Sequence, residues 1–359
     1  MHKRSILLLV LFLLATPVWA IAQQGAAASG SKPKSKTETL SAPPVERENW
    51  GVLGDLKTGL ESPTYAVLER NEQPDFVREL IRVEWRLADP IDLWVTRPKV
   101  AGKAPVVVYL YSHLDTGEQF RDNGWCERAT AGGFAAVGFV SALTDYRFRF
   151  RPLKQWFVSE LAESLGTTVH DVQLTLNYLA SRGDMDMDHV GMFGMGSGAS
   201  IAILAAHADT RIKALDLLDP WGDWPEWLKA SPVVPDDERS KYLTPEFLKS
   251  VAGLDPVSYL SSLRSRNLRL QQTLSEPETP KIAKEHIAAA MANPKQLVQY
   301  ANAEDLLKAW ETSGLSGWIK QQMRPQPPQG DDNGRVALGG KSSASGGSER
   351  PGSKKENEN

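Results

Sequence analysis

The feature that most constrains this chain is the alternation of short β-branched apolar runs with longer stretches whose apolar residues recur at helical spacing. The apolar runs predict strands at 105–111, 134–140, 190–195, 212–218, 268–274 and 297–300. The helical patterns lie at 161–179, 199–206, 282–291 and 306–319. Strands and helices that alternate in this way form a mostly parallel sheet with helices on both faces. The sequence therefore predicts an α/β fold.

Two segments depart from this alternation. Residues 83–87 and 91–95 are strand-like and flank the turn dipeptide Asp89-Pro90, which predicts a hairpin. Residues 221–262 contain three tryptophans and several prolines. We expect this second segment to form a small cap over one end of the sheet.

The two ends of the chain differ in composition from its middle. Residues 1–22 have a basic start, an apolar run over 6–15 and small residues at Ala20 and Ala22, which is typical of a secretory signal peptide. The protein is therefore expected to be exported, to the periplasm or outside the cell, with no stable membrane span after cleavage. Residues 23–47 and 324–359 are rich in Gly, Ser, Pro and charge, and predict a disordered leader and tail. The predicted folded domain is 48–323.

Composition argues against several classes of function. The 359 residues have a formal net charge of −3, so no basic surface for nucleic acid is expected. A single cysteine, Cys126, excludes a disulfide framework and a zinc site built from several cysteines. No metal-ligand cluster or phosphate-binding lysine motif is present, so neither a metal nor a cofactor is expected. A small molecule or a peptide remains the expected kind of ligand.

Four segments occur in an order that points to one family. They are the hairpin FVRE…VEW, the strand PVVVYLY, the strand GGFAAVGF and the segment DHVGMFG. Together the order resembles the α/β-hydrolase superfamily, in its dienelactone-hydrolase and prolyl-oligopeptidase branches, over residues 76–323. The resemblance implies a central sheet with a serine nucleophile on a G-x-S-x-G turn between a strand and a helix.

The turn that matches this motif lacks the serine at its centre. It reads Gly194-Met195-Gly196-Ser197-Gly198, so the outer glycines place Gly196 at the nucleophile position and Ser197 one residue late. In this family the nucleophile has a strained backbone, and glycine adopts positive φ without a steric cost. We therefore predict that Gly196 keeps the turn but provides no hydroxyl.

The other catalytic positions are also altered. The segment TLSEPETP at 273–280 matches the family's acid loop and places Glu276 at the acid position. The family's histidine would follow the last strand, but the loop 301–305 has none, and His286 falls within a predicted helix. The family's His-Gly oxyanion loop reads Tyr111-Ser112 here. A hydroxyl without a base is a weak nucleophile, so loss of Ser–His–acid catalysis is predicted.

Two other interpretations remain open beside a degenerate hydrolase that binds a ligand or partner. One is a divergent exported esterase or peptidase-like hydrolase that uses Ser197 or a relocated base such as His113. Candidate site residues should lie near the carboxyl ends of the strands, where α/β folds bind ligands. They are Ser112, His113, Asp115, Ser197, Asp219, Trp221 and Glu276. Four of these are the predicted pocket residues, namely Ser112, His113, Asp219 and Trp221.

The minor interpretation is a dinucleotide-binding protein. The segment 194–199 also matches G-x-G-x-x-A between a strand and a helix, and Asp216 and Asp219 follow near the distance expected for a ribose-binding acid. The same pattern arises in other glycine-rich turns, so the motif is weakly specific.

Overall fold

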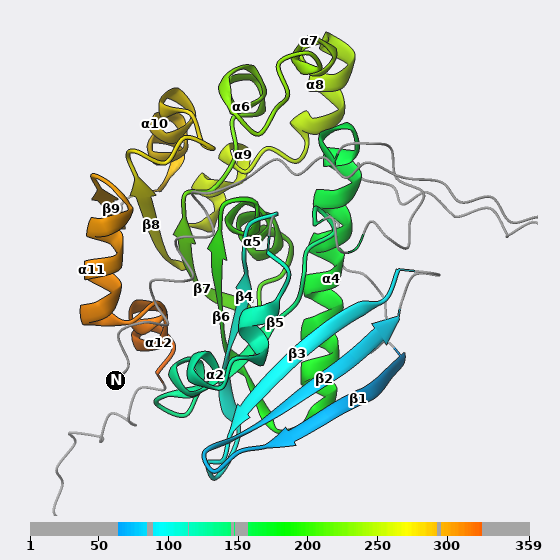
Figure 1. Cartoon of the computed structure of the whole chain (residues 1–359), viewed down its shortest axis with the longest axis vertical. Coiled ribbons are helices and arrows are strands. Elements are labelled where there is room, and N and C mark those ends of the chain that lie inside the picture. The colour runs from blue at the N-terminus through cyan, green and yellow to red at the C-terminus, as the bar shows by residue number, and fades with distance from the viewer. Residues whose placement is uncertain are drawn as a thin grey trace, which may run out of the picture. The chain divides into compact units, whose positions relative to one another are not determined.

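The computed structural model describes residues 64–84, 89–113, 115–144, 147, 157–292 and 296–324. These residues belong to one compact unit of the chain. Within them, nine strands form one sheet in the order β1-β2-β3-β5-β4-β6-β7-β8-β9 (Figure 1). The predicted signal peptide, leader and tail lie outside the described residues.

The six predicted strands lie next to one another in this sheet and are parallel throughout. They are β4 Ala104–Leu110, β5 Ala135–Gly138, β6 Met185–Met195, β7 Ile212–Leu218, β8 Asn267–Thr273 and β9 Gln296–Tyr300. The prediction of a single, mostly parallel sheet is confirmed. Because β6 lies between β4 and β7, it does not open a separate dinucleotide-binding half at a sheet edge.

Three antiparallel strands extend the sheet beyond β5. They are β1 Thr64–Glu72, β2 Phe76–Glu84 and β3 Ile91–Pro98, and β3 pairs with β5. The predicted hairpin is confirmed as β2–β3, although β2 begins earlier than expected and residues 85–88 lie outside the described residues. Sequence patterns did not predict β1, because this edge strand is exposed along nearly its whole length and lacks an apolar alternation.

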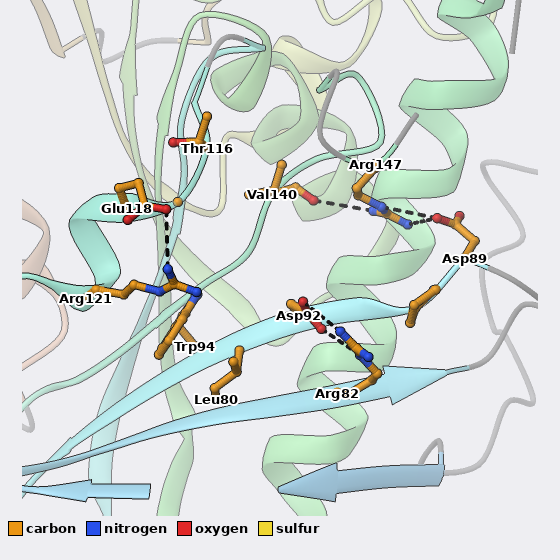
Figure 2. A pocket seen from close by; sticks show the side chains of 12 residues that line it. Leu80, Arg82, Asp89, Asp92, Trp94, Thr116, Glu118, Arg121, Val140 and Arg147 are labelled. Carbon is orange, nitrogen blue, oxygen red and sulfur yellow. Dashed lines mark hydrogen bonds and ion pairs between the residues drawn. The ribbon is translucent and has the colours of Figure 1, made fainter. Parts of the chain in front are cut away.

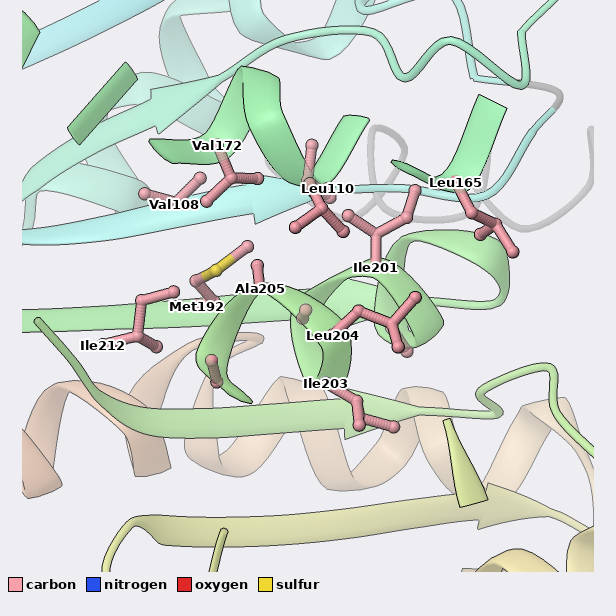
Figure 3. Packing of buried hydrophobic residues seen from close by; sticks show 14 of the residues in the cluster. Val108, Leu110, Leu165, Val172, Met192, Ile201, Ile203, Leu204, Ala205 and Ile212 are labelled. Atoms are coloured by element: carbon pink, nitrogen blue, oxygen red, sulfur yellow. The ribbon is translucent and has the colours of Figure 1, made fainter. Parts of the chain in front are cut away.

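Helices cover both faces of the parallel strands. Along β4, Val106, Val108 and Leu110 belong to one buried cluster and the alternate residues to another. The first cluster includes side chains of α4 Leu161–Arg182 and α5 Ser197–Ala208 (Figure 3). The second includes side chains of α2 Asn123–Thr130 and α12 Gly317–Gln322. Burial on both faces explains why β4 and β5 are almost continuously apolar.

The predicted cap is built from short helices at the carboxyl ends of the strands (Figure 1). They are α6 Trp224–Ala230, α7 Arg239–Tyr242, α8 Pro245–Ala252, α9 Val257–Leu260 and the 3₁₀ turn Ser261–Leu263. Its three tryptophans are buried, and the Trp221 and Trp227 rings are 4.7 Å apart. Each fully buried large apolar side chain contributes roughly 1.5–3 kcal/mol, so the tryptophans anchor the cap.

The last part of the chain corrects one prediction. Residues 306–319 are not one helix, because α11 Ala303–Ser313 ends at Gly314 and α12 begins at Gly317. Gly314 has φ 74°, and its N–H bonds to the carbonyl of Trp310, which closes the first helix. The predicted helix at 282–291 is present as α10 Lys281–Ala290. Among the described helices, none is both long enough and apolar enough to cross a membrane.

Candidate functional site

The turn between β6 and α5 has the conformation that the sequence predicts. Gly196 has φ 56° and ψ −122°, and α5 begins at the next residue, Ser197. The N–H of Gly196 donates to the carbonyl of Leu218 at 2.9 Å, which fixes the apex against the end of β7. Gly196 is therefore the apex of the turn, and Ser197 lies in the first turn of the helix.

The two outer glycines are required because backbone segments approach each other closely. A Cβ atom on Gly194 would lie 2.5 Å from the Cα of Ala199. A Cβ atom on Gly198 would lie 2.2 Å from the carbonyl oxygen of Leu110, at the end of β4. Distances this short exclude any side chain at either position, so the motif has one possible alignment.

A neighbouring side chain fills the space beside Gly196. A Cβ atom on Gly196 would lie 2.4 Å from Oγ of Ser112 and 3.5 Å from Nε1 of Trp221. Ser112 is 7% exposed, and its Oγ has no hydrogen-bond partner among the described residues. The apex therefore lacks a nucleophile, and the volume that its side chain would need holds the Ser112 hydroxyl.

Neither nearby serine is linked to a base. Ser197 is fully buried, and its Oγ, like that of Ser112, has no hydrogen-bond partner in the part of the chain that the structure describes. The His113 ring lies 5.0 Å from the Trp221 ring, and burial lowers the pKa of His113 to about 4. His113 is thus a neutral imidazole near the turn, but it makes no hydrogen bond to either serine hydroxyl.

Three other histidines bond to groups elsewhere. The pairs are His189 with Asp186, His207 with Ser262 and His286 with Asp223. His286 projects from α10 toward the start of the cap and is more than half exposed. A histidine linked to the cap in this way does not supply the missing base at the turn.

Glu276, the predicted acid, lies at the same end of the sheet in the loop between β8 and α10. Its carboxylate accepts hydrogen bonds from the backbone N–H groups of Glu278 and Thr279. Lys284 of α10 is 4% exposed and donates from Nζ to the carbonyls of Thr273 and Glu276 at 2.5 and 2.6 Å. Its Nζ also lies 3.5 Å from the Glu276 carboxylate, so Lys284 fastens the whole loop to the helix.

Two further carboxyl groups lie near this loop, Asp219, which is buried, and Glu278, which is partly buried. Asp219 follows β7 with φ 45°, and its Oδ1 accepts from the N–H of Thr273 at 2.8 Å. Burial raises the pKa of Asp219 to about 7, although Lys284 opposes the shift. Burial also raises the pKa of Glu278 to about 7, and the nearby Glu276 carboxylate adds to the shift. Sequence reasoning missed Glu278, and its only clue was a second acid in the motif S-E-P-E-T-P.

The remaining candidates have structural partners. Asp115 accepts from the Gly117 N–H and the Gln119 side chain, and so caps its own loop. Asp216 is fully buried and forms a fork with Arg269 at 2.9 and 2.6 Å, which leaves it unsuited to bind a ribose. In the described parts of the chain, no cluster of three or more His, Cys, Asp or Glu side chains could hold a metal ion.

A pocket of about 150 Å³ lies away from the turn, between the β2–β3 ribbon and the loop that follows β4 (Figure 2). Its lining includes Trp94, Thr116 and Arg121, but none of the four predicted pocket residues. Trp94 and Arg121 carry no motif, so sequence patterns gave no reason to select them.

The chain matches known proteins in structure but not in sequence. No family model and no curated protein matches the sequence. Among solved structures, an acetyl xylan esterase from Paenibacillus sp. R4 is 15% identical, with a TM-score of 0.56 over 75% of this chain and 96% of that one. Acetyl xylan esterase 1 from Thermoanaerobacterium sp. JW/SL YS485 is 14% identical, with a TM-score of 0.54 over 72% and 90%.

A third similar structure is an acylaminoacyl peptidase from Pyrococcus horikoshii. It is 12% identical, with a TM-score of 0.52 over 75% of this chain and 51% of that one. The sheet order, the strand-to-helix turn and these structural matches define the chain as an α/β-hydrolase fold. At this level of identity the similarity establishes the fold and leaves the activity to the site itself.

Proposed function

We propose that this protein is a catalytically degenerate member of the α/β-hydrolase fold, which acts by binding a small ligand, a peptide or a partner. One observation carries the proposal: the apex of the turn is Gly196, and Ser112 occupies the space of the nucleophile's side chain. The fold is retained around a turn whose apex carries no hydroxyl, and no described base is hydrogen-bonded to the Ser112 hydroxyl beside it.

The lack of a general base and the altered oxyanion loop are both expected to lower the rate of catalysis. General-base assistance is typically worth ~10²–10⁴-fold, and no described base is hydrogen-bonded to a serine near the apex. Loss of one oxyanion donor costs ~10²–10³-fold, and Ser112 replaces the glycine that the family has in that loop. Restoring the serine alone should therefore not restore efficient catalysis.

The competing function is a divergent esterase or peptidase-like hydrolase. It is favoured by the names of the structural neighbours and by the neutral His113 close to the turn. In that case Ser197 would be the nucleophile, although its hydroxyl is fully buried and lies inside a helix.

Turnover of a short-chain aryl ester separates the two functions. We expect no turnover above background by the wild-type protein, by Gly196→Ser, or by the double variant Gly196→Ser with Ser112→Gly. The double variant is included because it restores both the hydroxyl and the space for it. Wild-type turnover that Ser197→Ala abolishes would replace the binding function with hydrolysis.

We also propose that the protein is exported, on the basis of the charge and apolar pattern of residues 1–22. The mature protein isolated from its own host should begin after Ala20 or Ala22. Intact mass measurement would contradict export if the purified chain retained the whole of this segment.

A further inference from the structure

The pocket between the β2–β3 ribbon and the loop after β4 is lined by both arginines and carboxylates. The arginines are Arg82, Arg121 and Arg147, the carboxylates are Asp89, Asp92 and Glu118, and the apolar side chains are Leu80, Trp94 and Val140 (Figure 2). Its volume of about 150 Å³ is below the ~300–1,000 Å³ typical of sites for drug-sized ligands. A fitting ligand is therefore small.

Two of the three arginines are committed to partners. Arg147 is buried and pairs with Asp89 at 2.9 Å and with Asp171 at 2.5 Å. Arg82 makes a two-point contact with Asp92 at 2.9 and 3.0 Å. The fork between Arg82 and Asp92 uses both oxygens of that carboxylate, and Arg147 is shared between two carboxylates, so these arginines have little left to offer a ligand.

Arg121 differs from the other two. Among the described residues its one carboxylate partner is Glu118, 3.5 Å away, and both side chains are more than half exposed. Exposed pairs of this kind contribute about 0–1 kcal/mol, so the contact is easily exchanged. The Arg121 guanidinium nevertheless lies 5.3 Å from the centre of the Trp94 ring, which holds it at the pocket.

A fourth arginine, Arg78, does not line the pocket but lies against the same tryptophan. Arg78 is 7% exposed and lies 5.9 Å from the centre of the Trp94 ring. It donates to the carbonyl of Arg121 and to Asn123, but no carboxylate lies within ion-pair distance among the described residues. Its Nε atom has no hydrogen-bond partner there either. A buried cation without a counter-charge favours an anion nearby.

We propose that this pocket binds a small carboxylate with an apolar body, whose carboxylate replaces Glu118 on Arg121 while the body contacts Leu80, Trp94 and Val140. This deepens the binding role proposed above by naming a ligand class and a site for it. The site shares no residue with the strand-to-helix turn, so its test can fail independently of the ester-turnover test.

The experiment is ¹⁹F NMR titration of the full chain with 4-fluorobenzoate, and with 4-fluorobenzamide as its neutral counterpart. We expect the acid to bind at least tenfold more tightly than the amide. Arg121→Gln should weaken acid binding at least tenfold, since charged hydrogen bonds are the strong ones. Arg70→Gln, an equal charge change on exposed β1 outside the pocket, should leave it unchanged.

A further variant, Glu118→Gln, tests whether the Glu118 carboxylate competes with the ligand for Arg121. Removing a competing carboxylate should tighten acid binding by about two- to fivefold, whereas a merely structural role for Glu118 predicts no tightening. The proposal is overturned if the acid does not bind, if acid and amide bind equally, or if Arg121→Gln behaves like Arg70→Gln.

Discussion

Gly196 and Ser112 share one small volume at the end of the sheet. In an active hydrolase of this fold that volume would hold the nucleophile, but here the Ser112 hydroxyl comes within 2.4 Å of where a Cβ on Gly196 would lie. The positive φ of Gly196 adds a second barrier, because non-glycine residues in such conformations cost ~1–3 kcal/mol. The two positions should therefore respond to substitution as a pair.

We expect Gly196→Ala to lower the free energy of unfolding by about 2–4 kcal/mol, from backbone strain and contact with Ser112. Adding Ser112→Gly should recover at least about 1 kcal/mol of that loss, because it removes the contact and leaves the strain. Denaturant unfolding of the wild type, both single variants and the double variant measures this coupling. Strictly additive effects would show that Ser112 does not occupy the apex space.

The buried carboxyl of Asp219 gives a prediction about pH. Its pKa is about 7 in the folded protein, above its ordinary value of 3.8, because burial disfavours the charged form. Between these two values the folded state binds more protons than the unfolded state, so this group lowers stability as pH rises from about 4 to about 7.

Asp219→Asn removes this titration and suits the site, since asparagine tolerates positive φ and its side-chain oxygen can still accept from Thr273. The variant should gain stability relative to wild type as pH rises from 4 to 7, by about 1–3 kcal/mol, and the difference should then level off. Thermal unfolding across this pH range measures it. A difference that stays constant with pH would refute the raised pKa.

At the scale of elements, the loop from β8 to α10 is held by one buried lysine. Lys284→Met should destabilise the protein by about 3–5 kcal/mol, because it leaves buried carbonyls and carboxylates without their cation. Lys281→Met is the matched control on the same helix, since Lys281 is 89% exposed and should change stability by less than about 0.5 kcal/mol.

Hydrogen exchange provides the local readout for the lysine. Amides of the loop between Thr273 and Pro280 should exchange faster in Lys284→Met, while those of β4 should not change beyond the global loss of stability. Equal effects of the two lysine substitutions would mean that α10 does not fasten the loop.

Sequence patterns predict those helices and strands whose buried residues form a regular apolar pattern. Strand β4 and residues 190–195 of β6 are buried on both faces and lack charged residues, and α4 shows a regular apolar spacing. The first half of β6 is polar and partly exposed, and sequence patterns did not predict it. The exposed strand β1 has no such apolar pattern. The break between α11 and α12 depends on one residue, Gly314, which has a positive φ. The apolar spacing on either side of Gly314 is helical, so the spacing predicts one uninterrupted helix.

Some residues of the candidate site could likewise be predicted from the sequence, and others could not. The three glycines of the turn could be predicted because they match the spacing of a known motif, although Gly198 is required by the approach of Leu110 from another strand. The Ser112 hydroxyl beside Gly196, the partly buried Glu278 near Asp219 and the Arg121–Trp94 pair each involve segments far apart in the chain. Such contacts depend on how the elements pack, and no local spacing encodes them.

At the scale of the whole molecule, the strand-to-helix turn and the pocket lie on different parts of the sheet. Buried side chains surround the turn under the cap, whereas the pocket opens beside the antiparallel strands. Fold and site are determined by different residues, so the fold alone does not decide the chemistry of either place.

The most direct test of the account is labelling of the native chain with a fluorophosphonate, which forms a covalent bond only with an activated serine. Intact mass spectrometry reads the result, and an active serine hydrolase in the same mixture confirms that the reagent is competent. We predict that the control is labelled fully and that this chain gains no adduct while it remains folded. A stoichiometric adduct on Ser197 or Ser112 would contradict the loss of serine chemistry.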